Sequence, residues 1–215
     1  VYQRAFGMAD AEHGRPLRED SVMYAASFTK AMFATLVMQL EKEGVLDLDK
    51  SIENMLPKPL SDYEKYSDLS GDERWKKITP RMLLSHTSGL PNWRWFEPGE
   101  KLRIYFTPGQ RYAYSGEGIN LLQFVLENGL KLDVGDLMHK RVFHRYGMQR
   151  TSMVWQPQYA GDIAIGHDEK GVALGHKQRG SARAAGSADA SLIDMASFMR
   201  AMIRRDGMPK TQFNT

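Results

Sequence analysis

The segment 27–43 constrains the fold more than any other part of this 215-residue chain. It holds good helix formers and ends before Gly44, a residue that can cap a helix C-terminus. Its apolar residues lie on most faces and not along one stripe: Ala31, Phe33, Ala34, Leu36, Val37, Met38 and Leu40. A helix that is apolar on most sides is a buried one. Other elements must therefore form layers around it.

The remaining pattern predicts many helices and few strands. Thr79-Pro80 is typical of a helix start, with Thr as N-cap and Pro at the first position. We expect further helices at about residues 118–127, 133–145 and 190–205. Strand character is limited to residues 1–8 and to short pieces near Val22 and Ser152. Residues 161–185 are rich in Gly and small side chains, which predicts a loop or hairpin.

Composition excludes several functional classes. The chain is 42% hydrophobic and 26% charged, which is ordinary for a globular protein. Its net charge of +3 is spread along the sequence, and the densest basic stretch, Arg200, Arg204 and Arg205, is more typical of a solvated helix face than of a nucleic-acid site. No cysteine is present, no apolar run approaches the roughly 20 residues of a membrane span, and no signal peptide is recognisable. We therefore expect no nucleic-acid partner and no membrane span.

The Ser27-Phe28-Thr29-Lys30 segment carries the strongest chemical signal. It is the single place where Lys follows Ser by three positions, a spacing that puts both side chains on one helix face. Burial disfavours the charged form of a lysine, so its amine can act as a base toward the hydroxyl. A serine in the first turn also lies at the positive end of the helix dipole, where its backbone N–H can hold an oxyanion. The alternative interpretation is that Ser27 only caps the helix and that Lys30 extends its charged end to solvent.

Tyr114 is the second candidate. It stands in Tyr112-Ala113-Tyr114-Ser115-Gly116, which follows the turn at Thr107-Pro108-Gly109-Gln110. A tyrosine hydroxyl beside a lysine amine can take part in proton transfer. Alone, a tyrosine before a helix is more often a packing residue.

Four segments together resemble one known family. Ser27-x-x-Lys30 within Ala-Ala-Ser-Phe-Thr-Lys resembles the first motif of the serine β-lactamase-like and penicillin-binding-protein superfamily, which includes class C β-lactamases, D-alanyl-D-alanine carboxypeptidases and related esterases. Residues 83–90, Leu-Leu-Ser-His-Thr-Ser-Gly-Leu, are similar to its helix-to-loop segment. The approach to Tyr114-Ser115 is similar to its second motif, and residues 184–187 with the following helix resemble a return toward its sheet.

The resemblance implies a fold and a set of roles. The fold class would be α/β plus all-α, an antiparallel sheet flanked by helices with an inserted helical lobe, the sheet being incomplete in this chain. The resemblance places the helical lobe at about 45–185 and the α/β lobe at 1–44 and 186–215. Ser27 would be the acylated nucleophile, with Lys30 and Tyr114 in proton transfer and Ser115 and Gly116 contacting substrate. No metal or other cofactor is implied, and a periplasmic or secreted location is favoured.

The sequence departs from the family pattern at two places. The second motif usually reads Tyr-x-Asn, and here Gly116 replaces the Asn whose amide can bond a substrate carbonyl. The third motif, Lys- or His-x-Gly on a late strand, is not found, since His176 is followed by Lys177-Gln178. We expect the missing strands to come from a C-terminal continuation or another chain, because so few strands cannot form a stable sheet alone.

Other histidines offer weaker alternatives. His86 suggests a catalytic triad, but in the family segment it would fix the loop by hydrogen bonds, and no Gly-x-Ser-x-Gly elbow exists. His167, Asp168 and His176 do not show a metal-ligand spacing.

Three functional hypotheses follow for the chain. The leading one is a serine hydrolase that forms an acyl-enzyme on an ester, amide, β-lactam or peptide-like substrate. The second is a binding or sensing domain that can be acylated but does not turn over. The third is an inactive structural fragment of a larger assembly.

Overall fold

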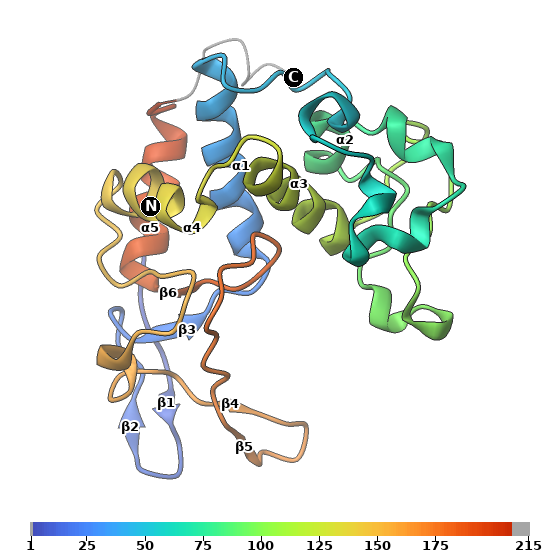
Figure 1. Ribbon diagram of the computed structural model, residues 1–215. Helices are drawn as coiled ribbons and strands as arrows, with labels where there is room; N and C mark the ends of the chain where they lie inside the picture. The colour runs from blue at the N-terminus through green and yellow to red at the C-terminus, as the bar shows by residue number, and fades with distance from the viewer. Residues whose placement is uncertain (1, 208–215) are drawn as a thin grey trace. The chain divides into compact units, whose positions relative to one another are not determined.

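The computed structural model describes residues 2–207, and the chain divides into two compact units (Figure 1). One unit is formed by Val1–Gln39 with Gly135–Thr215, and the other by Leu40–Val134. The second unit is therefore a continuous insertion between the two halves of the first. This order matches the inserted lobe that the resemblance implied, although the boundaries differ as described below.

The first unit contains the strands and most of the long helices. Its helices are α1 (Phe28–Lys42), which runs on into the second unit, α4 (Val134–Met138), which is extended by a π-helical turn at His139–His144, and α5 (Leu192–Ile203). Its strands are β1 (Met8–Asp10), β2 (Arg15–Pro16), β3 (Val22–Tyr24), β4 (Gly166–His167), β5 (Ala173–Leu174) and β6 (Asp189–Ser191). Within residues 2–207 these strands form antiparallel pairs in the order β1-β2, β3-β6 and β4-β5.

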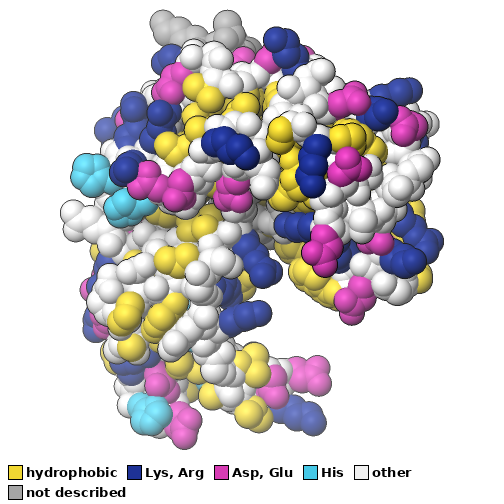
Figure 2. Space-filling model, in the orientation of Figure 1, with side chains coloured by type: hydrophobic (Ala, Val, Ile, Leu, Met, Phe, Trp, Pro, Cys, Tyr) yellow, Lys and Arg dark blue, Asp and Glu magenta, His cyan; other side chains and the backbone are white. Residues whose placement is uncertain are grey.

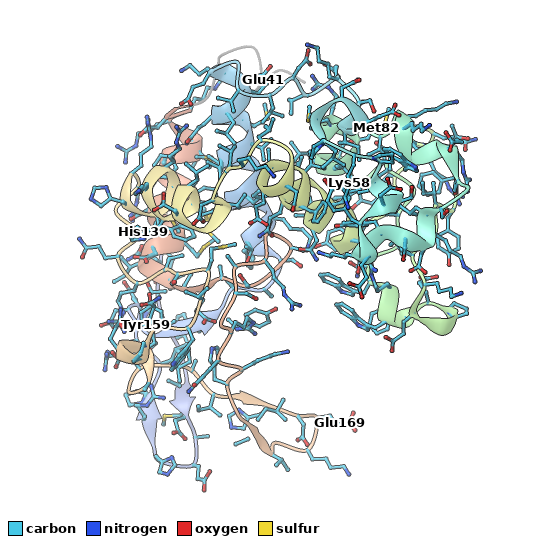
Figure 3. All side chains as sticks on the ribbon, viewed as in Figure 1. Glu41, Lys58, Met82, His139, Tyr159 and Glu169 are labelled. Carbon is cyan, nitrogen blue, oxygen red and sulfur yellow. The ribbon has the colours of Figure 1, made fainter. Side chains whose placement is uncertain are left out.

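Strand β3 is paired on both sides. Val22 pairs with Ser191 of β6, and on its other side its carbonyl accepts a hydrogen bond from Ala164 N at 2.8 Å. The fully buried Val22 side chain packs with Tyr159, labelled in Figure 3, and with Ile163. Segments from both halves of the unit therefore hold the strand that leads into α1.

Helix α1 is largely buried, as its sequence predicts, although Phe28 is 67% exposed and Ala31 is also exposed. Met32, Phe33, Leu36 and Val37 have no exposed surface. Each such side chain contributes about 1.5–3 kcal/mol when it leaves water. The predicted helix is confirmed, with bounds Phe28–Lys42 in place of 27–43.

Every regular element wholly within residues 40–134 is helical. The α-helices among them are α2 (Pro80–Leu84) and α3 (Gly116–Asn128). Short 3-10 helices cover Ile52–Met55, Leu60–Asp62, Glu64–Leu69, Glu73–Lys77, Arg94–Phe96 and Pro98–Glu100, and the other unit has one at Pro157–Tyr159. Thr79 caps α2 by accepting a hydrogen bond from the backbone N–H of Met82, which confirms the predicted start.

Two sequence predictions differ from the structure. Residues 1–8 were expected to be a strand, but β1 begins only at Met8, and Val1 lies outside the described residues. The helical lobe was expected at about 45–185, whereas residues 135–185 group with the first unit. The physical reason is long-range pairing, since Ser152 bridges Asp189 and Ile163 bridges Val22. The hairpin expected within 161–185 is present as β4 and β5.

Charged side chains of both signs are interspersed on the face shown in Figure 2. Among the residues that the structure describes, none of the helices has the length and apolar character needed to span a bilayer.

Gly129 ends α3 and cannot accept a side chain. A Cβ atom there would lie 2.1 Å from the carbonyl oxygen of Met55, although the φ angle of −88° suits any residue. We predict that Gly129→Ala lowers the free energy of unfolding by about 2–3 kcal/mol, a cost typical of forced overpacking. Gly161→Ala is the matched control, because no atom lies within 4 Å of its added methyl group. Equal urea midpoints for the two variants would contradict this packing.

Candidate active site

The turn that carries Ser27 is backbone-strained and tied down. Ser27 is exposed and directly precedes α1. Ala26 has a φ of +47°, a conformation that costs a non-glycine residue about 1–2 kcal/mol. Two contacts hold the turn in place, Ala25 N to Ala188 O at 2.9 Å and Thr29 Oγ1 to Ala26 O at 2.6 Å. The surrounding structure therefore fixes the direction in which Ser27 leaves the strand.

Lys30 is buried beside Ser27. Its side chain Nζ donates to Ser27 Oγ at 2.9 Å and to the carbonyl oxygen of Ala185 at 2.6 Å, and the residue is 7% exposed. The Nζ–Oγ separation is within the range for direct proton transfer. The structure thus brings together the two residues that the sequence paired.

Residues 185–188 are hydrogen-bonded to the same part of the chain. Tyr24 donates its hydroxyl to Gly186 O at 2.7 Å, and Ala188 N donates to Thr29 Oγ1 at 3.1 Å. Thr29 therefore links the strained Ala26 to the strand β6 segment, with no exposed surface of its own. Sequence reasoning missed Thr29 and Ala185. A threonine placed between Ser27 and Lys30 in a first helical turn was the one available signal.

The second unit carries Tyr114 and His86. His86 has a φ of +58°, its carbonyl accepts from Ala113 N at 2.8 Å, and its Nδ1 accepts from Ser115 N at 3.1 Å. Its ring contacts that of Tyr114 with centroids 4.5 Å apart. The expectation that His86 fixes this loop by hydrogen bonds is confirmed. Tyr114 is 39% exposed and belongs to the unit that does not contain Ser27.

The backbone at position 89 requires the glycine that follows Ser88 in the 83–90 segment. Its φ is +83°, and a Cβ atom there would lie 2.6 Å from the carbonyl oxygen of Phe106. The loop reverses at a point where a side chain does not fit.

The sequence predicts that Ser115 and Gly116 contact substrate, and both lie at the start of α3. The Ser115 side chain is fully buried, and its hydroxyl donates to Pro91 O and accepts from Gly118 N, both at 2.8 Å. It is the N-cap of α3. Gly116 N donates to Asn92 Oδ1 at 3.0 Å, and the Gly116 Cα faces the indole ring of Trp93.

Within residues 2–207, neither His167 nor His176 belongs to a group of side chains that could hold a metal ion. His176 Nε2 lies 3.3 Å from Asp189 Oδ2, and burial raises the pKa of that carboxyl group. His167 lies in β4 on the exposed hairpin. No group of three or more His, Asp or Glu side chains with metal-binding geometry occurs within residues 2–207.

Comparison with known proteins decides the family. The sequence profile of the beta-lactamase family matches residues 1–214. The chain belongs to the beta-lactamase family. This confirms the resemblance that the four segments indicated.

Two curated relatives illustrate the range of the beta-lactamase family. The chain is 27% identical over 170 residues to penicillin-binding protein 4* of Bacillus subtilis and 35% identical over 131 residues to the esterase EstB of Burkholderia gladioli. The first match covers 70% of this chain and 35% of the relative, and the second covers 61% and 30%. The chain thus spans about a third of the length of these relatives.

Solved structures show the same fold. The D-alanine carboxypeptidase AmpC from Burkholderia cenocepacia aligns with a TM-score of 0.75 at 21% identity, over 95% of this chain and 56% of that one. A class C beta-lactamase from Rhodobacter sphaeroides aligns with a TM-score of 0.71 at 20% identity, over 94% and 57%. The predicted fold class is confirmed, and the chain represents about half of each neighbour.

Thr29 provides a test of the Ser27 turn. Thr29→Val keeps the side-chain shape but removes the acceptor of the Ala188 N–H. We predict a loss of about 1–3 kcal/mol in the free energy of unfolding, the cost of an unpaired buried donor. Thr29→Ser keeps the hydroxyl and is the matched control. If urea denaturation gave a smaller loss in the free energy of unfolding for Thr29→Val than for Thr29→Ser, the role assigned to this hydroxyl would be contradicted.

Proposed function

We propose that this protein is a serine hydrolase that cleaves esters through an acyl-enzyme on Ser27. One observation carries the proposal. The buried Lys30 amine lies 2.9 Å from an exposed serine hydroxyl at the start of α1, in a chain of the beta-lactamase family. The residue pair needs no metal or other cofactor for this reaction.

The first chemical step is the attack of Ser27 Oγ on the ester carbonyl carbon. A bond forms between Oγ and that carbon while the hydroxyl proton passes to Lys30 Nζ. The tetrahedral intermediate then collapses, its carbon–oxygen bond to the alcohol breaks, and the alcohol leaves with the proton that Lys30 took from Ser27. In the second half, water attacks the acyl carbon and gives a proton to Lys30. The bond between that carbon and Ser27 Oγ then breaks, Oγ takes the proton back, and the acid is released.

Two further groups complete the proposal. Tyr114 is assigned to proton transfer through the resemblance of its motif, and its partial exposure supports a hydroxyl that substrate can reach. The Ser27 N–H at the start of α1 is assigned as a donor to the oxyanion. Preorganised donors of this kind are worth about 10²–10³ in kcat.

The substrate class follows from Gly116. Without a side-chain amide at this position, the protein offers less help to a substrate whose leaving group is an amine. Esters need less assistance because an alcohol is a better leaving group. The similarity to an esterase agrees with this choice, whereas the similarity to a penicillin-binding protein keeps amides and β-lactams in the comparison.

The experiment is a hydrolysis panel of a short-chain ester, a chromogenic cephalosporin and a D-Ala-D-Ala peptide. We predict that the protein expressed from its complete gene favours the ester. Ser27→Ala should lower turnover about 10³-fold or more, Lys30→Ala should cost about as much, and the double variant should lose little more, because residues of one catalytic unit are not additive. Tyr114→Phe keeps the ring packed on His86 and removes only the hydroxyl.

The outcomes separate the alternatives. If the turnover of Tyr114→Phe is within a factor of a few of the wild-type turnover, Tyr114 is a packing residue. Ser27 that is acylated by an ester or penicillin but never released would favour the non-hydrolytic binding domain. Ester turnover that survives Ser27→Ala would overturn the proposal.

A further inference from the structure

The carbonyl oxygen of Ala185 links Lys30 to a distant part of the first unit. It accepts a hydrogen bond from Lys30 Nζ at 2.6 Å, and this contact is buried. Because the same Nζ donates to Ser27 Oγ, a displaced carbonyl changes the direction and length of the contact between Nζ and Oγ. The residues that fix this carbonyl therefore bear on the proposed nucleophile from a distance.

Tyr24 holds the residue that follows Ala185. Its hydroxyl donates to Gly186 O at 2.7 Å. Gly186 also lies against the turn before Ser27, since a Cβ atom built on it would lie 3.5 Å from the carbonyl carbon and oxygen of Ala26. Tyr24 thus anchors this segment beside the strained residue that precedes the proposed nucleophile.

The guanidinium of Arg179 lies over the Tyr24 ring. Its central carbon is 3.7 Å from the ring centroid, well within the range of a cation–π contact. The Arg179 side chain is 16% exposed, and such contacts become stronger as water is excluded from them. The backbone of Arg179 is held as well, because its carbonyl oxygen accepts from Trp155 N at 2.8 Å. Arg179 therefore restrains the ring whose hydroxyl binds the 185–186 segment.

Asp189 in turn holds the Arg179 guanidinium. Strands β3 and β6 lie side by side (Figure 1), and Asp189 is directly opposite Tyr24, so both side chains lie on one face of the pair. Asp189 Oδ1 accepts from Arg179 Nη1 at 3.4 Å, Oδ2 lies 3.3 Å from His176 Nε2, and the residue has no exposed surface. Burial raises the pKa of the Asp189 carboxyl group, whereas His176 and Arg179 lower it. An unpaired buried charge is costly, so this pairing keeps the guanidinium in place.

We infer that Arg179 and Tyr24 are positioning residues for the Lys30 amine. The Arg179 guanidinium holds the tyrosine ring, and the tyrosine hydroxyl holds the segment whose Ala185 carbonyl accepts from that amine. This inference rests on the proposed function. Every contact in the series lies within the first unit, and Tyr24 belongs to the strand that leads into α1. Neither residue is assigned a contact with substrate, since both act as support for a reacting group.

The test measures the rate constant with which an excess of a fluorophosphonate ester labels Ser27 in the protein expressed from its complete gene. Ser27 Oγ displaces fluoride from phosphorus, so the rate reports on this hydroxyl without a need for turnover. We expect Tyr24→Phe and Arg179→Met each to lower the rate constant about tenfold, because small displacements of a reacting group are costly in rate. The double variant should lose little more than either single variant, since residues in contact couple. Arg179→Lys keeps a cation over the ring and should recover part of the rate.

Two matched variants separate positioning from stability. Tyr146→Phe also removes a hydroxyl that donates to a backbone carbonyl, that of Asp206 at 3.0 Å. Arg4→Met also removes a guanidinium that lies over an aromatic ring, that of Phe6 with the centroid 5.2 Å away. Each variant is measured at a temperature at which circular dichroism shows it to be folded, and both controls should keep the wild-type rate constant.

Ester hydrolysis gives a second readout. If the two residues position the amine and do not contact substrate, Tyr24→Phe and Arg179→Met should lower kcat and leave KM nearly unchanged. A rise in KM at unchanged kcat would instead make them substrate-binding residues and overturn the inference.

The outcomes distinguish this inference from the proposed function. Ser27 that is labelled at the wild-type rate in both Tyr24→Phe and Arg179→Met would overturn the inference and leave the function standing. An equal fall in the two control variants would overturn it as well, and a fall in one test variant alone would overturn the assignment of the other residue. If Ser27 of the wild-type protein is neither labelled nor required for ester hydrolysis, the proposed function fails and the inference with it.

Discussion

The burial of the Lys30 amine is the constraint on which the first unit depends. An ammonium or amine group taken out of water is costly unless hydrogen bonds replace its hydration. Here Ser27 Oγ and the carbonyl oxygen of Ala185 accept those bonds. Because Ala185 lies 155 positions further along the chain, the segment before β6 has to return to the start of α1. The β3–β6 pairing and the bridging hydroxyl of Thr29 hold it there.

The second unit is held together by contacts of its own. The loop 91–94 is joined to the start of α3 by the Ser115 cap, by Asn92 and by the Arg94–Glu117 pair. These bonds hold Tyr114 between the ring of His86 and a rigid helix terminus. They also fix Trp93 against Gly116, where an added Cβ atom would lie 2.4 Å from the indole ring. Each group of assigned residues is therefore preorganised within its own unit.

The sequence predicted what local patterns encode. The periodicity of residues 28–42, the Thr79-Pro80 start and the Ser27–Lys30 spacing all depend on neighbours along the chain, and each agrees with the structure. The grouping of residues 135–185 with the first unit was not predictable, because it depends on pairing of Ser152 and Ile163 with distant strands. The contact between Trp93 and Gly116 was not predictable either. In the sequence, Gly116 indicates only that the side-chain amide of the family's motif is absent. The burial of Ser115 likewise follows from the approach of Pro91.

The central claim is that Ser27 is the nucleophile, and covalent labelling tests it most directly. The native protein would be treated with a fluorophosphonate ester, digested, and mapped by mass spectrometry. The account predicts one phosphonylated serine, Ser27, because it is exposed beside Lys30 Nζ. Ser115 is the competing candidate from the second motif, but its hydroxyl is buried and engaged in capping α3. A label on Ser115, or on any serine other than Ser27, would contradict the account.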